Sequence, residues 1–403
     1  MTLADFGWAI ARIAIMLGFL LSVLPLLIWL ERRALAWFQC RIGPNRLGPF
    51  GLLQPMADAV KLFFKEEIVP ASADRFIWAL APALSLFPAL VAAATIPWGP
   101  NRLLTPVADV DIGVLYFLAM SSLAAYGVLL AGWSSNNKYS LLGGLRSSAQ
   151  VISYELGMGL ALATAVLAAG SFRMTTIVEA QAQPLWGVVP FLHNWLIFTP
   201  WGLVGGALFF VCMLAETNRA PFDLPEAESE LVAGYQTEYS SMKFAAFFMG
   251  EYVAILAICG VMTTCFLGGY LAPINWSPIQ ALGEGGGLWG VLATLTGALM
   301  PPLWFVLKLF GLFFSFLWIR ATLLRLRYDQ LMNLGWRFLI PAGLLNLALL
   351  TVYVIWGWIP ALIGYAVAIA AYFLVFGARR PERRTVALLS EAQPYRPKEA
   401  QSG

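Results

Sequence analysis

Long uninterrupted apolar stretches are the feature that most limits what this 403-residue chain can fold into. Several of them reach the roughly 20 residues that a helix needs to cross the hydrocarbon core of a bilayer. Because that core contains no water to bond an exposed backbone, a spanning stretch must be a helix or part of a closed barrel. The short alternating segments of a barrel are absent. Only 12% of the residues are charged, against about 25% in soluble domains, so the composition excludes a soluble protein.

Hydropathy predicts an all-α polytopic membrane protein with nine spans. They fall at residues 7–30, 77–97, 112–133, 150–169, 198–216, 243–270, 289–319, 337–357 and 360–377. The last two are separated by a break between Gly357 and Pro360, and a single helix of that length would overshoot the bilayer. We therefore predict one transmembrane domain, 1–377, followed by a basic and solvated tail, 378–403.

The first apolar run, from Phe6 to Leu30, is too long for the core of a signal peptide and has no basic segment before it. We predict that it stays in the protein as the first span. Threading the spans places nearly all basic loop residues on one side, and only Arg102 and Arg173 on the other, with Arg12 inside the first span. This asymmetry predicts a periplasmic N-terminus in the inner membrane of a bacterium and basic loops in the cytoplasm.

The first basic loop contains a turn-rich segment at residues 43–51, and an amphipathic stretch begins near Pro55. Its apolar residues Met56, Val60 and Phe63 share one helical face, opposite Asp58, Lys61 and Lys65. One interpretation is a helix that lies in the membrane interface. The other is a helix whose apolar face lines an entrance for an amphipathic ligand.

Cysteine and histidine usage argues against a redox centre in this chain. The four cysteines, Cys40, Cys212, Cys259 and Cys265, lack cluster spacing, and His193 is the only histidine. We expect the cysteines to be small packing residues. No glycine-rich nucleotide fingerprint follows a strand.

Seven of the 22 acidic residues lie between positions 216 and 251, where only Arg219 and Lys243 oppose them. They are Glu216, Asp223, Glu226, Glu228, Glu230, Glu238 and Glu251. If residues 223–231 are helical, Asp223, Glu226 and Glu230 share one face, where like charges repel and favour proton uptake. A proton path and an acidic loop that docks a partner both remain open.

Four ionisable residues fall within or at the ends of predicted spans, where such residues are costly and usually functional. They are Glu155, Glu216, Glu251 and Lys308. A proton path is one interpretation, and an ion pair between helices, such as Lys308 with one of these acids, is the other. A further charged group follows the seventh span and consists of Arg320, Arg325, Arg327 and Asp329. Most of this group is explained by the anchoring of a span through positive charge on its cytoplasmic side.

Four segments together resemble the H subunit of respiratory complex I, the bacterial counterpart of the mitochondrial ND-one protein. They are ERRALAWFQCRIGPNRLGPFGLLQPMADAVKLFFKEE (31–67), RSSAQVISYELG (146–157), AETNRAPFDLPEAESELVAGYQTEY (215–239) and WIRATLLRLRYDQLMNLGW (318–336). The resemblance covers about residues 5–357 and implies eight core helices. It implies a proton-translocating NADH-quinone oxidoreductase, in which this chain forms the membrane end of the quinone chamber and is inactive alone.

The resemblance also implies that this chain holds no cofactor, that quinone is the substrate, and that FMN and iron–sulfur clusters sit in partner subunits of the membrane and peripheral arms. It implies roles for the matching residues. Those near quinone would be Arg32, Arg41, Arg46, Asp58, Lys61, Arg219, Asp223, Arg320 and Arg325, with Asp329 on the facing loop. Those on the proton path would be Glu155, Glu216, Glu226, Glu228, Glu230, Glu238 and Glu251.

Two departures from the family pattern stand out. Leu324 occupies a position where the family commonly has proline, and the segment after residue 357 exceeds the family core. Two other functions stay open: the equivalent subunit of a ferredoxin- or F420-linked complex or membrane-bound hydrogenase, and an independent ion transporter. The second requires an inverted repeat, which this sequence lacks.

Overall fold

The computed structural model describes residues 3–187, 189–223, 232–274 and 288–377, and within them nearly every regular element is a helix. The predicted all-α class is confirmed. Seven helical segments of the described part are long and apolar enough to cross a membrane. The long helices are α1 (Leu3–Phe38), α3 (Arg75–Ala92), α4 (Gly113–Ser134), α5 (Lys138–Ala169), α7 (Pro200–Glu216), α9 (Ser241–Phe266), α11 (Leu288–Thr322), α13 (Ile340–Trp356) and α14 (Trp358–Gly377).

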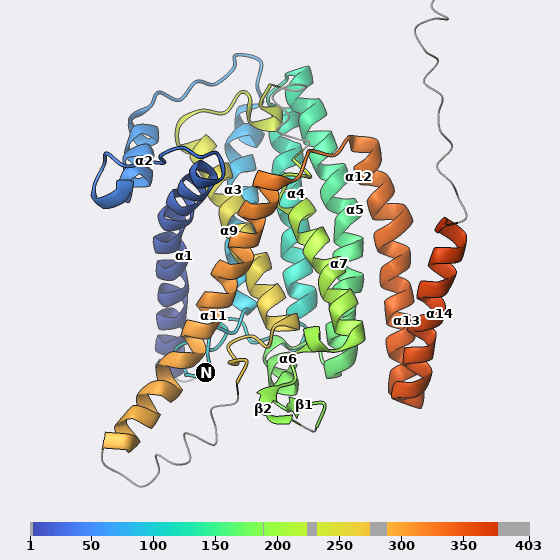
Figure 1. Ribbon diagram of the computed structural model, residues 1–403. Helices are drawn as coiled ribbons and strands as arrows, with labels where there is room; N and C mark the ends of the chain where they lie inside the picture. Colours follow the sequence, from blue (N-terminus) through green and yellow to red (C-terminus); the bar gives the residue numbers. More distant parts are fainter. Residues whose placement is uncertain (1–2, 188, 224–231, 275–287, 378–403) are drawn as a thin grey trace, which may run out of the picture. The chain divides into compact units, whose positions relative to one another are not determined.

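Helix α9 lies at the centre of the bundle, and helices α1, α3, α7 and α11 pack against it. Most of the α9 side chains from Phe247 to Phe266 are buried. Helices α3, α4, α5 and α7 continue the bundle as successive neighbours (Figure 1). Because α9 is apolar on all sides, it suits a position enclosed by other helices rather than one facing lipid on one side.

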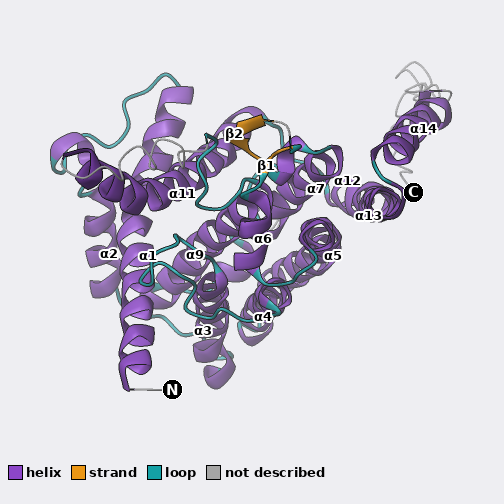
Figure 2. Cartoon of the chain, turned by 90° about the horizontal axis from the view of Figure 1, so that it is seen from below, coloured by secondary structure: helices purple, strands orange, loops and turns teal. Residues whose placement is uncertain are grey.

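The two ends of the bundle carry different connections. At one end, drawn at the top of Figure 1, lie the last turns of α1, α4, α7 and α11 and the first turns of α3, α5 and α9. The backbone amide of Asp74 donates to Ser134 there, and that of Leu326 donates to Pro221. The opposite end carries α6 (Met174–Gln181) and an antiparallel hairpin of β1 (Pro184–Leu185) and β2 (Val189–His193) (Figure 2).

The ends of the bundle at which the loops lie agree with the topology that the basic residues predicted. Basic loop residues such as Arg41, Arg75 and Lys138 belong to the first end, and Arg102 and Arg173 belong to the end with the hairpin. The hairpin and α6 fill the interval between the fourth and fifth predicted spans.

Side-chain caps explain where several helices begin. The Asp74 carboxylate accepts from the amides of Phe76 and Ile77 at 3.1 and 3.3 Å, at the start of α3. Asn137 caps α5 in the same way, so this helix begins at Lys138 and not near residue 150. The added turns carry Gly143, whose missing side chain lets Gly234 of the neighbouring loop approach closely. A hydropathy profile cannot register these less apolar turns.

Helices α13 and α14 are separate elements, as predicted. Helix α13 continues from α12 (Tyr328–Leu334) through a π-helical turn at Gly335–Leu339. It ends before Gly357, whose φ of 85° favours glycine and stops a right-handed helix. Helix α14 begins at the next residue. The predicted tail, 378–403, lies outside the described residues.

The amphipathic stretch of the first loop forms helix α2 (Gln54–Phe64). Its apolar side chains Met56, Val60 and Phe63 are more than half exposed. The cysteines divide into two groups. Cys212, Cys259 and Cys265 are buried packing residues, whereas Cys40 is exposed, so the packing prediction is wrong for that residue.

Candidate functional site

A buried group of charges joins three helices near the basic end of the bundle. Arg219, which follows α7, donates from Nη1 to Glu31 Oε1 of α1 at 3.0 Å. Its Nε lies 2.7 Å from Glu251 Oε1 of α9. Arg320 of α11 pairs with the same Glu31 oxygen, and the Tyr252 hydroxyl donates to the other one. In these five residues, which we call the charge cluster, the buried Arg219 pairs with both carboxylates and the more exposed Arg320 pairs with one of them.

The turn that carries Arg219 is held by a buried amide of α5. Gln150 Nε2 donates to the backbone carbonyls of Ala215 and Phe222, at 2.8 and 2.9 Å. The Arg219 amide in turn donates to Leu214 O at 3.3 Å. Because the backbone on both sides of the turn is hydrogen-bonded, the backbone of Arg219 is held in place. Its guanidinium group can then contact Glu31 and Glu251 at the same time. Its carbon also lies 4.7 Å from the centre of the Tyr252 ring.

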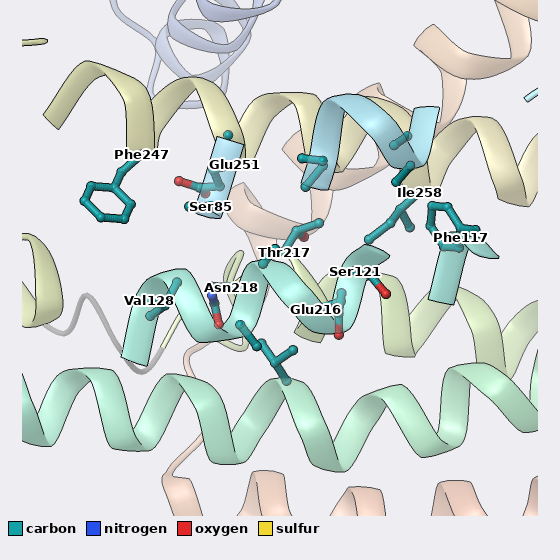
Figure 3. A pocket seen from close by; sticks show the side chains of 18 of the residues that line it. Ser85, Phe117, Ser121, Val128, Glu216, Thr217, Asn218, Phe247, Glu251 and Ile258 are labelled. Atoms are coloured by element: carbon teal, nitrogen blue, oxygen red, sulfur yellow. The ribbon is translucent and has the colours of Figure 1, made fainter. Parts of the chain in front are cut away.

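A cavity of about 80 Å³ lies next to the charge cluster, between α3, α4, α7 and α9. Glu251 faces it from α9, and Glu216 faces it from the last turn of α7 (Figure 3). Ser121, Thr217 and Asn218 add polar groups to a lining that is otherwise mostly apolar. The cavity therefore connects two carboxyl groups that the sequence assigned to one path.

Glu155 lies on α5 beside this cavity. Its Oε1 contacts the Ser122 hydroxyl of α4, and the Ser121 hydroxyl is 3.5 Å from the same oxygen. Ser121 also lines the cavity, so it connects Glu155 with the space that Glu216 faces. Glu216 Oε2 is buried, and no hydrogen bond satisfies it within the described part of the chain. The structure thus gathers Glu155, Glu216 and Glu251, the three embedded acids of the sequence prediction.

The remaining acids of the 216–251 region have separate positions. Glu238 Oε1 accepts from Asn137 Nδ2 at 2.7 Å, so it is tied to the residue that caps α5. Asp223 lies 3.9 Å from Arg325, which joins the loop after α7 to the loop after α11. The predicted shared face of Asp223 with its neighbours lies outside the described residues, as do Glu226, Glu228 and Glu230.

The predicted residues near quinone are brought together only in part. Arg320 and Arg219 belong to the charge cluster, and Arg32 of α1 pairs with Asp58 of α2. Arg41, Arg46, Lys61 and Asp329 are exposed and do not join the charge cluster; Arg41 instead bonds Gln39 at 2.6 Å.

Helix α2 is attached to the bundle at both of its ends. On the α1 side, Trp29 Nε1 and Arg33 Nη1 donate to Phe50 O at 3.0 and 3.1 Å. On the α9 side, the Ser241 hydroxyl donates to Leu62 O at 3.1 Å, and Lys243 pairs with Glu67. The exposed apolar face of α2 is therefore carried by the same helices, α1 and α9, that contribute Glu31 and Glu251.

Sequence reasoning missed Glu31 and Tyr252. Glu31 is 5% exposed and has three partners, yet no role was assigned to it from the sequence. The available signal was an acid directly before two arginines at the end of an apolar run. Tyr252 follows Glu251 directly, but a tyrosine in a span carries no signal of its own.

The suggested ion pair between Lys308 and an embedded acid is wrong. Lys308 Nζ donates to the backbone carbonyls of Leu267, Gly269 and Leu271, at 2.6, 2.9 and 2.6 Å. These carbonyls follow the C-terminal end of α9, where unpaired carbonyls and the helix dipole attract a cation. Lys308 therefore satisfies the end of a helix, and Arg219 is the cation that pairs with the embedded acid.

Comparison with known proteins decides the family. A family model described as NADH dehydrogenase matches residues 10–351. The chain is 48% identical over 337 residues to the H subunit of NADH-quinone oxidoreductase from Rickettsia bellii, a match that covers 83% of this chain and 90% of that protein. It is 45% identical over 361 residues to an H subunit of the same enzyme from Geobacter metallireducens, with 88% and 97% covered. The chain belongs to the NADH dehydrogenase family.

As a member of this family, the chain is a membrane subunit of NADH-quinone oxidoreductase, or complex I, and takes part in its oxidoreductase activity as a subunit. The family match ends at residue 351, so α14 lies beyond it. The charge cluster, the cavity and α2 all lie within the matched region.

Proposed function

We propose that this NADH dehydrogenase family subunit forms the membrane end of the chamber in which quinone is reduced, and that it carries the first part of the proton path coupled to that reduction. The electrons come from NADH through FMN and iron–sulfur clusters of partner subunits. This chain positions the quinone and conducts the protons. It holds no cofactor of its own in this proposal.

Three features support the quinone chamber. Helix α2 presents apolar side chains beside α1 and α9, which suits the isoprenoid part of a quinone. The charge cluster lies near the same end of these helices and offers guanidinium and hydroxyl groups to a polar headgroup. An apolar wall with few placed polar groups is the usual composition of a ligand site.

The chain of acids supports the proton path. Glu31 and Glu251 share Arg219, Glu251 and Glu216 face one cavity, and Glu155 contacts Ser121, which lines the same cavity. A change of charge near Glu31 alters the field at Glu251 directly, because both carboxylates compete for one guanidinium. The observation that carries the proposal is this shared pairing of Arg219, since it links the end near α2 with the cavity inside the bundle.

Substitutions of Glu251 and Glu216 by glutamine test the path in the assembled complex. Glutamine keeps the size but cannot exchange a proton. We expect normal NADH oxidation with ferricyanide, because that reaction ends before quinone, and a strong loss of quinone-linked turnover and of the proton gradient. Glu66→Gln, at an exposed position between α2 and α3, is the matched control. Full pumping by both cavity variants would refute the path.

The partners follow from the same proposal. The charged loops of the basic end would be covered by the peripheral arm, and the sides of the bundle by lipid and the other membrane-arm subunits. The chain expressed alone should neither oxidise NADH nor reduce quinone. The relatives named for NADH-quinone oxidoreductase favour this complex over the ferredoxin- or F420-linked alternatives.

We also propose that the chain lies in a bacterial inner membrane with its N-terminus in the periplasm, as the positive-inside asymmetry indicates. Asn45 lies in the segment after α1 and Asn101 in the segment between α3 and α4, and both are exposed. In a Cys40→Ser background, an impermeant thiol reagent applied to intact spheroplasts should label Asn101→Cys and leave Asn45→Cys unlabelled until the membrane is opened. The reverse pattern would refute the orientation.

A further inference from the structure

Two adjacent serines of α4 have a choice of hydrogen-bond acceptors. The hydroxyls of Ser121 and Ser122 both reach Glu155 Oε1, and both also lie close to Leu118 O, at 2.9 and 3.0 Å. A hydroxyl has one hydrogen to donate and can accept at the same time. Each serine can therefore donate either to the carboxylate or to its own helix, but not fully to both.

This choice lets Glu155 keep its partners in both of its protonation states. When Glu155 is charged, the hydroxyls donate to it, and bonds to an ionised acceptor are the stronger ones. When Glu155 is protonated, its carboxyl becomes a donor to a serine oxygen, and that serine turns its hydrogen to Leu118 O. A buried group without such an alternative would lose a hydrogen bond in one of the two states.

Ser121 also lies between Glu155 and the cavity. Ser121 lines the cavity together with Glu216 and Glu251, and Figure 3 shows the three side chains around it. Contact of two neighbouring hydroxyls with one carboxylate oxygen is more than packing requires, since each serine is already satisfied by Leu118.

We propose that Ser121 and Ser122 form a hydroxyl relay that passes protons between Glu155 and the cavity lined by Glu216 and Glu251. The inference rests on the proposed proton path and names a relay within it. One proton arrives at Ser121 Oγ from a protonated carboxyl of the cavity, directly or through water, while the proton of the hydroxyl leaves to Glu155 Oε1. The serine is neutral before and after, and the cavity carboxyl has become the charged group.

The test uses the assembled complex and the double substitution Ser121→Ala with Ser122→Ala. We expect ferricyanide-linked NADH oxidation to stay normal and quinone-linked turnover to fall about tenfold to a hundredfold, the effect of losing a hydrogen bond to a charged group. The slowdown in D2O should become larger than in the wild type. Ser121→Thr in place of alanine keeps the hydroxyl that lines the cavity and should restore most of the rate.

Ser315→Ala is the matched control, because Ser315 of α11 donates to Leu312 O at 2.6 Å in the same local manner but belongs to another helix. It should leave all rates unchanged. A purely structural role of the two serines predicts lower assembly and a parallel loss of ferricyanide activity, and this result would overturn the relay.

Glu155→Gln separates the relay from the path on which it rests. If Glu155→Gln pumps at the wild-type rate, Glu155 is not on the path, and the proposed path and the relay both fail at this residue. If Glu155→Gln loses pumping while the double serine variant keeps the wild-type rate and the wild-type D2O effect, only the relay is wrong.

Discussion

Two buried cations of this bundle, Arg219 and Lys308, are stabilised by different kinds of partner. Both residues are 9% exposed, so depth does not distinguish them. Arg219 is paired with the carboxylates of Glu31 and Glu251, whereas Lys308 is bonded to three backbone carbonyls at the end of α9. Carboxylates can be protonated and can move, and backbone carbonyls can do neither. The region of Arg219 is therefore suited to change its charge arrangement, and the region of Lys308 to keep a helix end fixed.

The largest effect is expected for Lys308→Met. This change leaves one buried and two partly buried carbonyls without this donor, at a cost of up to about 1–3 kcal/mol for each. We expect little assembled complex on a native gel and a clearly lower thermal midpoint for what assembles. Because the partners are backbone atoms, neutralising an embedded acid in the same chain should bring no recovery. Lys65→Met, at an exposed site, is the control. Normal assembly would contradict the assignment.

Arg219→Gln should have the next largest effect, which is a loss of stability. Removing one partner from a buried pair costs about 3–5 kcal/mol, since the remaining charges lose their compensation. Here a second change should help: adding Glu251→Gln removes one uncompensated carboxylate and should restore part of the stability, with a coupling energy of about 0.5–3 kcal/mol. Thermal midpoints of the two single variants and the double variant give this value. Strictly additive losses would show that the two side chains are not coupled.

The contrast between the two cations marks the limit of sequence reasoning here. Arg219, Glu251 and Glu216 could be selected because charges in or near an apolar run are rare and rarely unpaired. That Lys308 bonds backbone atoms 37 to 41 positions away could not be foreseen, because the sequence does not show which helix end faces which helix. Helix existence and order followed from hydropathy, since the bilayer sets the length of each span.

Elements without a hydropathy signal escaped the same reasoning. The hairpin β1–β2 and helix α6 are short and lie between spans, and the first turns of α5 are too polar to count as apolar. Glu31 was not selected because an acid beside two arginines fits an ordinary helix end. Only the fold brings Arg219 and Arg320 to it.

Glu31→Gln should have an intermediate effect. It removes a carboxylate that accepts bonds from Arg219, Arg320 and Tyr252, and bonds to charged groups are worth about 1.5–3 kcal/mol each. Glutamine still accepts one or two of them, so assembly should survive. Quinone-linked turnover should fall about tenfold while the ferricyanide rate stays normal. Equal loss of both rates would show that Glu31 only supports the fold.

The smallest effect is expected at the other end of the bundle, where Arg173 bonds Asp109 on exposed loops. The bond from Arg173 lowers the pKa of the Asp109 carboxyl below its ordinary value. The pair therefore contributes fully above the ordinary aspartate pKa of about 4 and loses its contribution as the pH falls below it. Asp109→Asn should cost at most about 1 kcal/mol near neutral pH, and less in high salt. A thermal midpoint that drops by many degrees would contradict this.

The pairing of Glu31 has a consequence for the biosynthesis of the chain. Its first guanidinium partner, Arg219, is 188 positions later in the sequence, and Arg320 is 289 positions later. At about 5–20 residues per second, Arg219 follows Glu31 from the ribosome after roughly 10–40 seconds. During this interval α1 has the carboxyl group but not its arginines. Glu31 therefore lacks the guanidinium partners of the folded bundle until α7 and α11 have followed α1 into the membrane.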